Sequence, residues 1–119
     1  MMSSLEELFT LQKGLMDSLG IELHQQPSID VYHDHFVAAC IGLASEALEV
    51  LDEINVATRP WAEKPAEETQ DAVAKEAIDA LFYLLEIFIF LNIGPFQVYQ
   101  LYEEKWRINM NRVLTKSKD

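Results

Sequence analysis

A nearly continuous apolar stretch at residues 80–93, interrupted by the charged residue Glu86, constrains this chain more than any other sequence feature. The stretch is shorter than the roughly 20 residues of a membrane span, so it predicts a buried core helix and no membrane partner. A helix that is apolar on nearly every face needs neighbours on most of those faces. One small helical unit rarely surrounds a helix so well, and we expect a second copy of the chain to cover it.

The remaining sequence also has the pattern of helices. Apolar residues recur at helical spacing, and the chain holds only 4 Gly and 4 Pro, which leaves little turn chemistry for a sandwich or barrel. Pro60 and Pro65 separate the second helix from the third, and Gly94-Pro95 separates the third from the fourth. We expect a single all-α domain over residues 1–119, with helices at residues 5–19, 29–56, 67–92 and 96–114, the third starting at residues 67–71.

The formal net charge of −11 restricts the partners of this chain. Binding nucleic acid through charge requires a basic patch, so we expect no nucleic-acid partner. To hold a polyphosphate, so acidic a protein needs a metal ion that reverses the local sign of charge. The single cysteine, Cys40, cannot form an intramolecular disulfide and predicts a buried thiol in a reducing cytoplasm. The first residues lack the pattern of a signal peptide, which also favours a cytoplasmic location.

Two pairs of acidic residues are the candidate metal ligands of this chain. Glu46 and Glu49 on the second helix, and Glu76 and Asp79 on the third, are each three residues apart, so each pair shares a helix face. The flanking residues are mostly apolar, and burying carboxylates together is costly unless a cation joins them. Magnesium, which manganese can replace, suits oxygen ligands and keeps room for water and phosphate. The four acids therefore predict a metal site between two antiparallel helices, where bound metal activates water for attack on phosphorus.

The four acids at this spacing resemble the signature of the all-α nucleoside triphosphate pyrophosphohydrolases, which include the MazG-type enzymes and the dimeric dUTPases. The resemblance extends over nearly the whole chain. It implies a four-helix unit of the MazG or dimeric dUTPase type that assembles as a homodimer or homotetramer. It also implies magnesium-dependent hydrolysis of a nucleoside triphosphate, with deoxyuridine triphosphate as the first choice, to the monophosphate and pyrophosphate. Glu46 or Glu49 is then the catalytic base.

Three further features are similar to the dimeric dUTPase branch. They are Leu8-x-x-Leu11-Gln12, the pair Trp61 and Lys64, and Tyr102-x-x-Lys105-x-x-x-Asn109-x-x-Arg112. The resemblance implies that Gln12 and Trp61 contact the base and sugar, that Lys64 belongs to the substrate-binding loop, and that the last three residues hold phosphate. Leu15 departs from the branch, which commonly has Asn there, and this weakens the assignment to uracil.

Two other classes fit parts of the pattern. A ferritin-like di-metal protein would carry a Glu-x-x-His pair on each of two helices, and neither acidic helix here has one. A non-catalytic helical dimerisation module would leave the acids solvated, and magnesium would then not change its melting temperature. Glu86, amid apolar residues, is expected to need a lysine or arginine partner.

Overall fold

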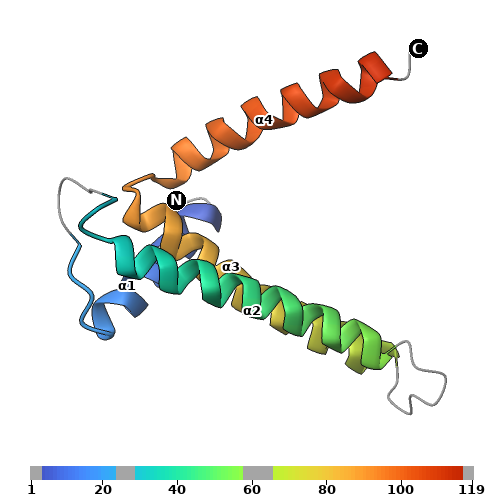
Figure 1. Ribbon diagram of the computed structural model, residues 1–119, viewed down its shortest axis with the longest axis horizontal. Helices are drawn as coiled ribbons and strands as arrows, with labels where there is room; N and C mark the ends of the chain where they lie inside the picture. The colour runs from blue at the N-terminus through green and yellow to red at the C-terminus, as the bar shows by residue number, and fades with distance from the viewer. Residues whose placement is uncertain (1–3, 24–28, 58–65, 117–119) are drawn as a thin grey trace.

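The chain forms helices and no strand in the residues that the structure, a computed structural model, describes, which are 4–23, 29–57 and 66–116. The helices are α1 (Ser4–Ser18), α2 (His33–Ala57), α3 (Ala66–Phe90) and α4 (Pro95–Lys116) (Figure 1). The prediction of an all-α chain with four helices is therefore confirmed. Trp61 and Lys64, predicted to bind substrate, lie outside the described residues.

Two helix ends are closed by the same backbone motif. Gly20 after α1 and Asn92 after α3 both have positive φ, at 77° and 56°. The next residue in each case donates its N–H to the helix, Ile21 to the Met16 carbonyl at 3.1 Å and Ile93 to the Phe88 carbonyl at 3.0 Å. This arrangement satisfies carbonyls that a helix end leaves unpaired. It ends the first helix within one residue of the predicted end at residue 19, and it sets the sharp change of direction before Pro95.

The second helix begins four residues later than predicted. Residues 29–32 form a turn, in which the His33 N–H donates to the Asp30 carbonyl at 3.4 Å. The turn buries the Tyr32 ring, whose centroid lies 4.9 Å from that of Phe90 on α3. A contact between residues so distant in sequence gives no local signal, and the start of the helix was therefore predicted too early.

The packed part of the molecule is an antiparallel pair, α2 and α3, with α1 lying across α3 (Figure 1). The buried core lies where the three helices meet and contains Phe9, Met16, Tyr32, Leu85, Ile89 and Phe90. Near it, Gly42 of α2 lies so close to the Tyr83 ring of α3 that a Cβ would overlap the ring. This close approach keeps α2 against α3 just before the first predicted metal ligand.

The fourth helix leaves this body at an angle of 106° to α3. Val98 in its first turn packs against the core, and no described residue of α4 is buried. The large apolar residues Tyr99, Tyr102, Trp106 and Val113 are exposed along α4. Cys40 on α2 is exposed as well, so the prediction of a buried thiol was wrong for the single chain.

Among the described helices, none alone is long and apolar enough to cross a membrane; α3 and α4 together meet that criterion only as a bent pair.

Candidate metal and substrate site

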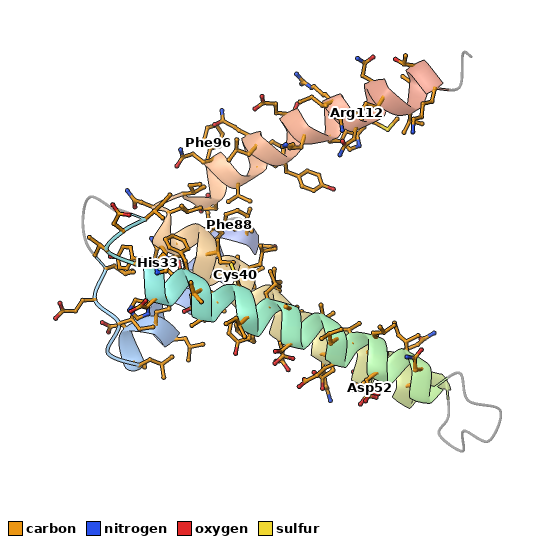
Figure 2. All side chains as sticks on the ribbon, in the orientation of Figure 1. His33, Cys40, Asp52, Phe88, Phe96 and Arg112 are labelled. Carbon is orange, nitrogen blue, oxygen red and sulfur yellow. The ribbon has the colours of Figure 1, made fainter. Side chains whose placement is uncertain are left out.

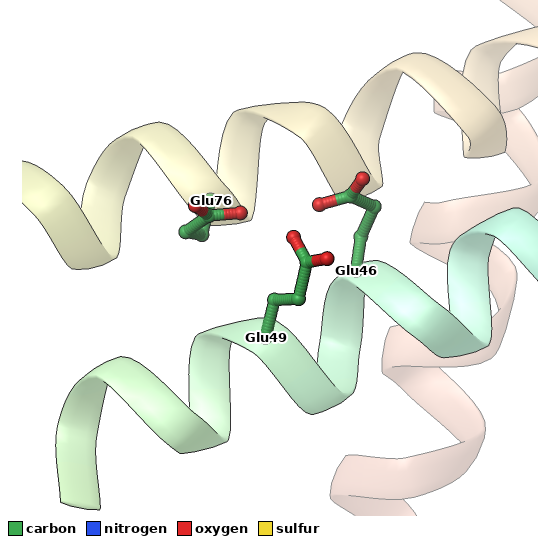
Figure 3. Close-up of side chains that lie close together, drawn as sticks. All are labelled: Glu46, Glu49 and Glu76. Carbon is green, nitrogen blue, oxygen red and sulfur yellow. The ribbon is translucent and has the colours of Figure 1, made fainter. Parts of the chain in front are cut away.

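Three glutamates converge between α2 and α3. Glu46 and Glu49 come from successive turns of α2, and Glu76 faces them from α3 (Figure 3). Each offers a carboxylate oxygen, and these oxygens all lie within 4.8 Å of one another. The sequence produces this arrangement because a spacing of three keeps Glu46 and Glu49 on one face, and the antiparallel pairing brings Glu76 opposite them. Three acids so close repel one another unless a proton or a cation is shared.

The electrostatics of the cluster show this repulsion. A proton shared with Glu49, followed by desolvation, raises the pKa of Glu76 from 4.5 to about 7. Desolvation and then the neighbouring Glu49 raise the pKa of Glu46. One oxygen each of Glu46 and Glu76 is buried without a hydrogen-bond partner among the described residues. Unpartnered carboxylate oxygens in a group of hard donors fit a divalent cation such as magnesium.

Asp79 lies next to this group. It follows Glu76 by nearly one turn, and its charge contributes to the raised pKa of Glu46. It does not belong to the three-residue donor group, and it borders a pocket that Glu46 also borders. The structure thus brings three of the four predicted metal ligands together and places the fourth at the border of the pocket.

The pocket has a volume of about 360 Å³ and lies between α1 and the α2–α3 pair. It is lined by Gln12, Leu15, Met16 and Leu19 of α1, Glu46 of α2, and Asp79, Phe82, Tyr83 and Glu86 of α3. Gln12 is only 3% exposed, and its Oε1 has no hydrogen-bond partner among the described residues. A buried amide without a partner next to an acidic cluster is suited to a polar ligand that enters the pocket.

The sequence placed Tyr83 and Glu86 on the stripe of Glu76 and Asp79, but it did not indicate that these two residues and Phe82 line a pocket. The available signal was their spacing, since they follow Asp79 by three, four and seven residues and therefore share its helix face. The expected lysine or arginine partner of Glu86 is absent from the described residues. Burial raises the pKa of Glu86, and the neighbouring His35 lowers it by a smaller amount.

The predicted phosphate-binding residues lie elsewhere in the single chain. Lys105, Asn109 and Arg112 are exposed on α4, which projects away from the acidic cluster (Figure 2). No lysine or arginine in the described ranges forms an ion pair with the three glutamates; Lys75, one residue before Glu76, pairs with Asp71 at 3.0 Å. Among the described residues of one chain, the acids therefore have no cationic side chain as a partner.

The chain matches no protein-family model, and comparisons with curated proteins and with solved structures gave no match.

Proposed function

We propose that this chain hydrolyses a nucleoside triphosphate to its monophosphate and pyrophosphate with the help of magnesium. The observation that carries the proposal is the convergence of Glu46, Glu49 and Glu76 within 4.8 Å beside a pocket that contains the buried, unpartnered amide of Gln12. Three carboxylates so close together can bind the metal, and the pocket beside them can hold a nucleoside. The spacing of the acids, which resembles that of the all-α pyrophosphohydrolases, supports the same reading.

Each residue of the site has a role that follows from its position. Glu46, Glu49 and Glu76 would hold the metal, with Asp79 at the border of the pocket. Bound magnesium or manganese would neutralise phosphate charge and make water a better nucleophile. Glu46 or Glu49 accepts the proton of the attacking water. Gln12 holds the nucleoside by hydrogen bonds, which offset the cost of its burial.

The substrate and location follow from the resemblance and the composition. Deoxyuridine triphosphate is the substrate that the resemblance puts first. The cytoplasm is the proposed location, because a single cysteine suits a reducing compartment.

The proposal also requires that at least two copies of the chain assemble. Lys105, Asn109 and Arg112 hold phosphate only if a second copy brings its α4 to the acids, since α4 lies away from them in the single chain (Figure 1). The homodimer or homotetramer expected from the apolar third helix provides this second copy. Exposed apolar residues along α2 and α4 support it.

Pyrophosphate release from a panel of canonical deoxynucleoside triphosphates and deoxyuridine triphosphate, with magnesium and with chelator, tests the proposal. We expect release with magnesium only. The variant Glu76→Gln should lose at least about 100-fold in rate, because even residues that only support metal ligands cost 10–100-fold. Asp52→Asn, which removes an exposed acid from α2 outside the cluster, should keep wild-type activity.

The non-catalytic dimerisation module makes the opposite prediction. Such a module would also have helices with exposed apolar residues, but it would have no specific binding site for magnesium. Folded protein that releases no pyrophosphate from any nucleotide, and whose melting temperature magnesium leaves unchanged, would establish that module and contradict the proposal.

A further inference from the structure

Glu86 is the carboxylate of the pocket that metal binding does not use. It lies seven residues beyond Asp79 and four beyond Phe82, so all three share a face of α3. At the rise of an α-helix, seven residues separate Asp79 from Glu86 by about 10 Å along the axis. The pocket thus has acids beside the metal cluster at one end and a separate carboxylate at the other, where a nucleotide with its phosphates at the cluster would present its base.

The surroundings of Glu86 leave this carboxylate without a partner. It is partly buried, and it has no hydrogen bond or ion pair within the described part of the chain. Burial without a partner disfavours a charged carboxylate. His35, whose ring stacks on Phe90 at a centroid distance of 5.1 Å, offsets this cost only in part. A ligand that donates hydrogen bonds to Glu86 would offset the remaining cost of burying its charge.

The walls between the two ends suit a flat ring. Leu15 is 45% exposed and Phe82 is 43% exposed, although both line the pocket. An aromatic base between them would cover this apolar surface and stack on the Phe82 ring. Gln12, with one amide donor and one acceptor group, can pair with the edge of any base.

The chemistry of a carboxylate then selects among the bases. An ionised carboxylate only accepts hydrogen bonds. Cytosine, adenine and guanine carry an exocyclic amine that donates, whereas thymine presents a carbonyl oxygen in place of the cytosine amine, and uracil presents the same oxygen. That oxygen would repel a carboxylate that faces the position of the cytosine amine, and the N3–H donor of uracil and thymine lies at a different position on the edge of the base.

We infer that Glu86 determines base specificity, and that the pocket selects deoxynucleotides with an amine-bearing base over those of uracil and thymine. The inference rests on the proposed function for the position of the phosphates. It changes the substrate expected from the resemblance, and it agrees with Leu15, where the uracil-specific branch commonly has Asn.

The test compares kcat/KM for five deoxynucleoside triphosphates, those of cytosine, adenine, guanine, uracil and thymine, with magnesium. We expect at least one amine-bearing substrate to exceed deoxyuridine triphosphate by about tenfold or more, the discrimination of one good polar pair. Glu86→Gln, whose amide both donates and accepts, should reduce this preference at least about fivefold while pyrophosphate release continues. Glu7→Gln, an exposed acid on α1, is the matched control.

Binding separates failure of this inference from failure of the proposed function. Thermal shifts of the whole protein with the five deoxynucleoside monophosphates and magnesium need no hydrolysis. Larger shifts for amine-bearing bases that Glu86→Gln equalises would support the inference even if nothing is hydrolysed. Deoxyuridine triphosphate as the best substrate, an unchanged preference in Glu86→Gln, or no binding of any monophosphate would overturn it. Glu86→Gln should melt no lower than wild type, since it removes a partly buried charge.

Discussion

Glu46, Glu49 and Glu76 repel one another as long as no cation lies between them, because their oxygens lie within 4.8 Å. Removing one charge should relieve this repulsion. In chelator at pH 8, we expect Glu76→Gln to melt at or above the wild-type temperature. With magnesium, wild type should gain stability and the variant should not, because a ligand that binds only the folded state stabilises it. Differential scanning calorimetry measures both, and Asp52→Asn should behave like wild type.

The same glutamate gives the metal-free protein a defined pH dependence. The folded-state pKa of Glu76 is about 7, above its ordinary value of 4.5. Between these values the folded chain binds more protons than the unfolded chain, so its free energy of unfolding decreases as pH rises. We expect the melting temperature in chelator to fall across this window more steeply in wild type than in Glu76→Gln. Equal slopes in the two proteins would contradict the raised pKa.

The sequence predicted the acids of the cluster better than the pocket. A spacing of three on one helix, opposite another acidic pair, was enough to bring Glu46, Glu49 and Glu76 together, since the α2–α3 pairing is antiparallel. Asp79 lies outside the three-residue group although it has the same spacing of three from Glu76, and it borders the pocket instead. The pocket depends on where α1 crosses α3, and this tertiary contact has no local sequence pattern.

At the scale of elements, the contact between α2 and α3 depends on the absence of a side chain at Gly42. A Cβ there would overlap the Tyr83 ring. We expect Gly42→Ala to lower the free energy of unfolding by about 1–3 kcal/mol, the usual cost of overpacking. Because Tyr83 also lines the pocket, the variant should weaken nucleotide binding as well. Chemical denaturation followed by circular dichroism measures the stability.

Gly14 provides the matched control for this substitution. It lies within α1, and a Cβ there would meet nothing within 4 Å. Gly14→Ala should therefore stabilise the protein by about 0.5–1 kcal/mol, since alanine favours a helix interior over glycine. If Gly42→Ala were as stabilising as Gly14→Ala, the close packing of α2 on α3 would be refuted.

Helical periodicity predicted which elements exist because each helix has apolar residues at helical spacing. It could not tell which apolar face meets which neighbour. The second helix has one stripe toward α3, with Phe36, Ala39 and Leu43, and another that is exposed, with Ile41 and Leu48. Cys40 lies outside the covered stripe, and the prediction that it is buried failed for this reason.

At the scale of the whole molecule, a single copy leaves more surface exposed to solvent than a folded monomer of its mass. The chain exposes 9355 Å², whereas a folded monomer of 13.6 kDa exposes about 6,600 Å². Its radius of gyration is 18.0 Å, compared with about 13.5 Å for a compact domain of this length. The excess of roughly 2,800 Å² is several times the about 800 Å² that each partner buries in a standard interface. An excess of this size is the surface that the proposed assembly of at least two copies would cover.

The second apolar stripe of α2 should form part of that assembly. Ile41 is 62% exposed and Leu48 is 66% exposed, and they are seven residues apart, the repeat of a helical seam. We expect light scattering after size exclusion to give a dimer or tetramer for wild type at micromolar concentration. Ile41→Glu with Leu48→Glu should shift the mass toward the monomer, whereas Asp52→Asn should not. A wild-type monomer that is fully folded would contradict the expectation.

The position of α4 leads to a stronger prediction about that assembly, because α4 projects away from the α2–α3 pair that carries the acids (Figure 1). If the partner's Lys105 completes the site, Glu76→Gln and Lys105→Ala should each impair a pure assembly. Co-expressed with two tags and purified through both, the mixed dimer contains one complete site, formed by the acids of one chain and Lys105 of the other. Symmetry then predicts about half of the wild-type rate of pyrophosphate release per dimer. If Lys105 instead acted on the acids of its own chain, both sites would be defective and the mixed protein would be no more active than the pure variants.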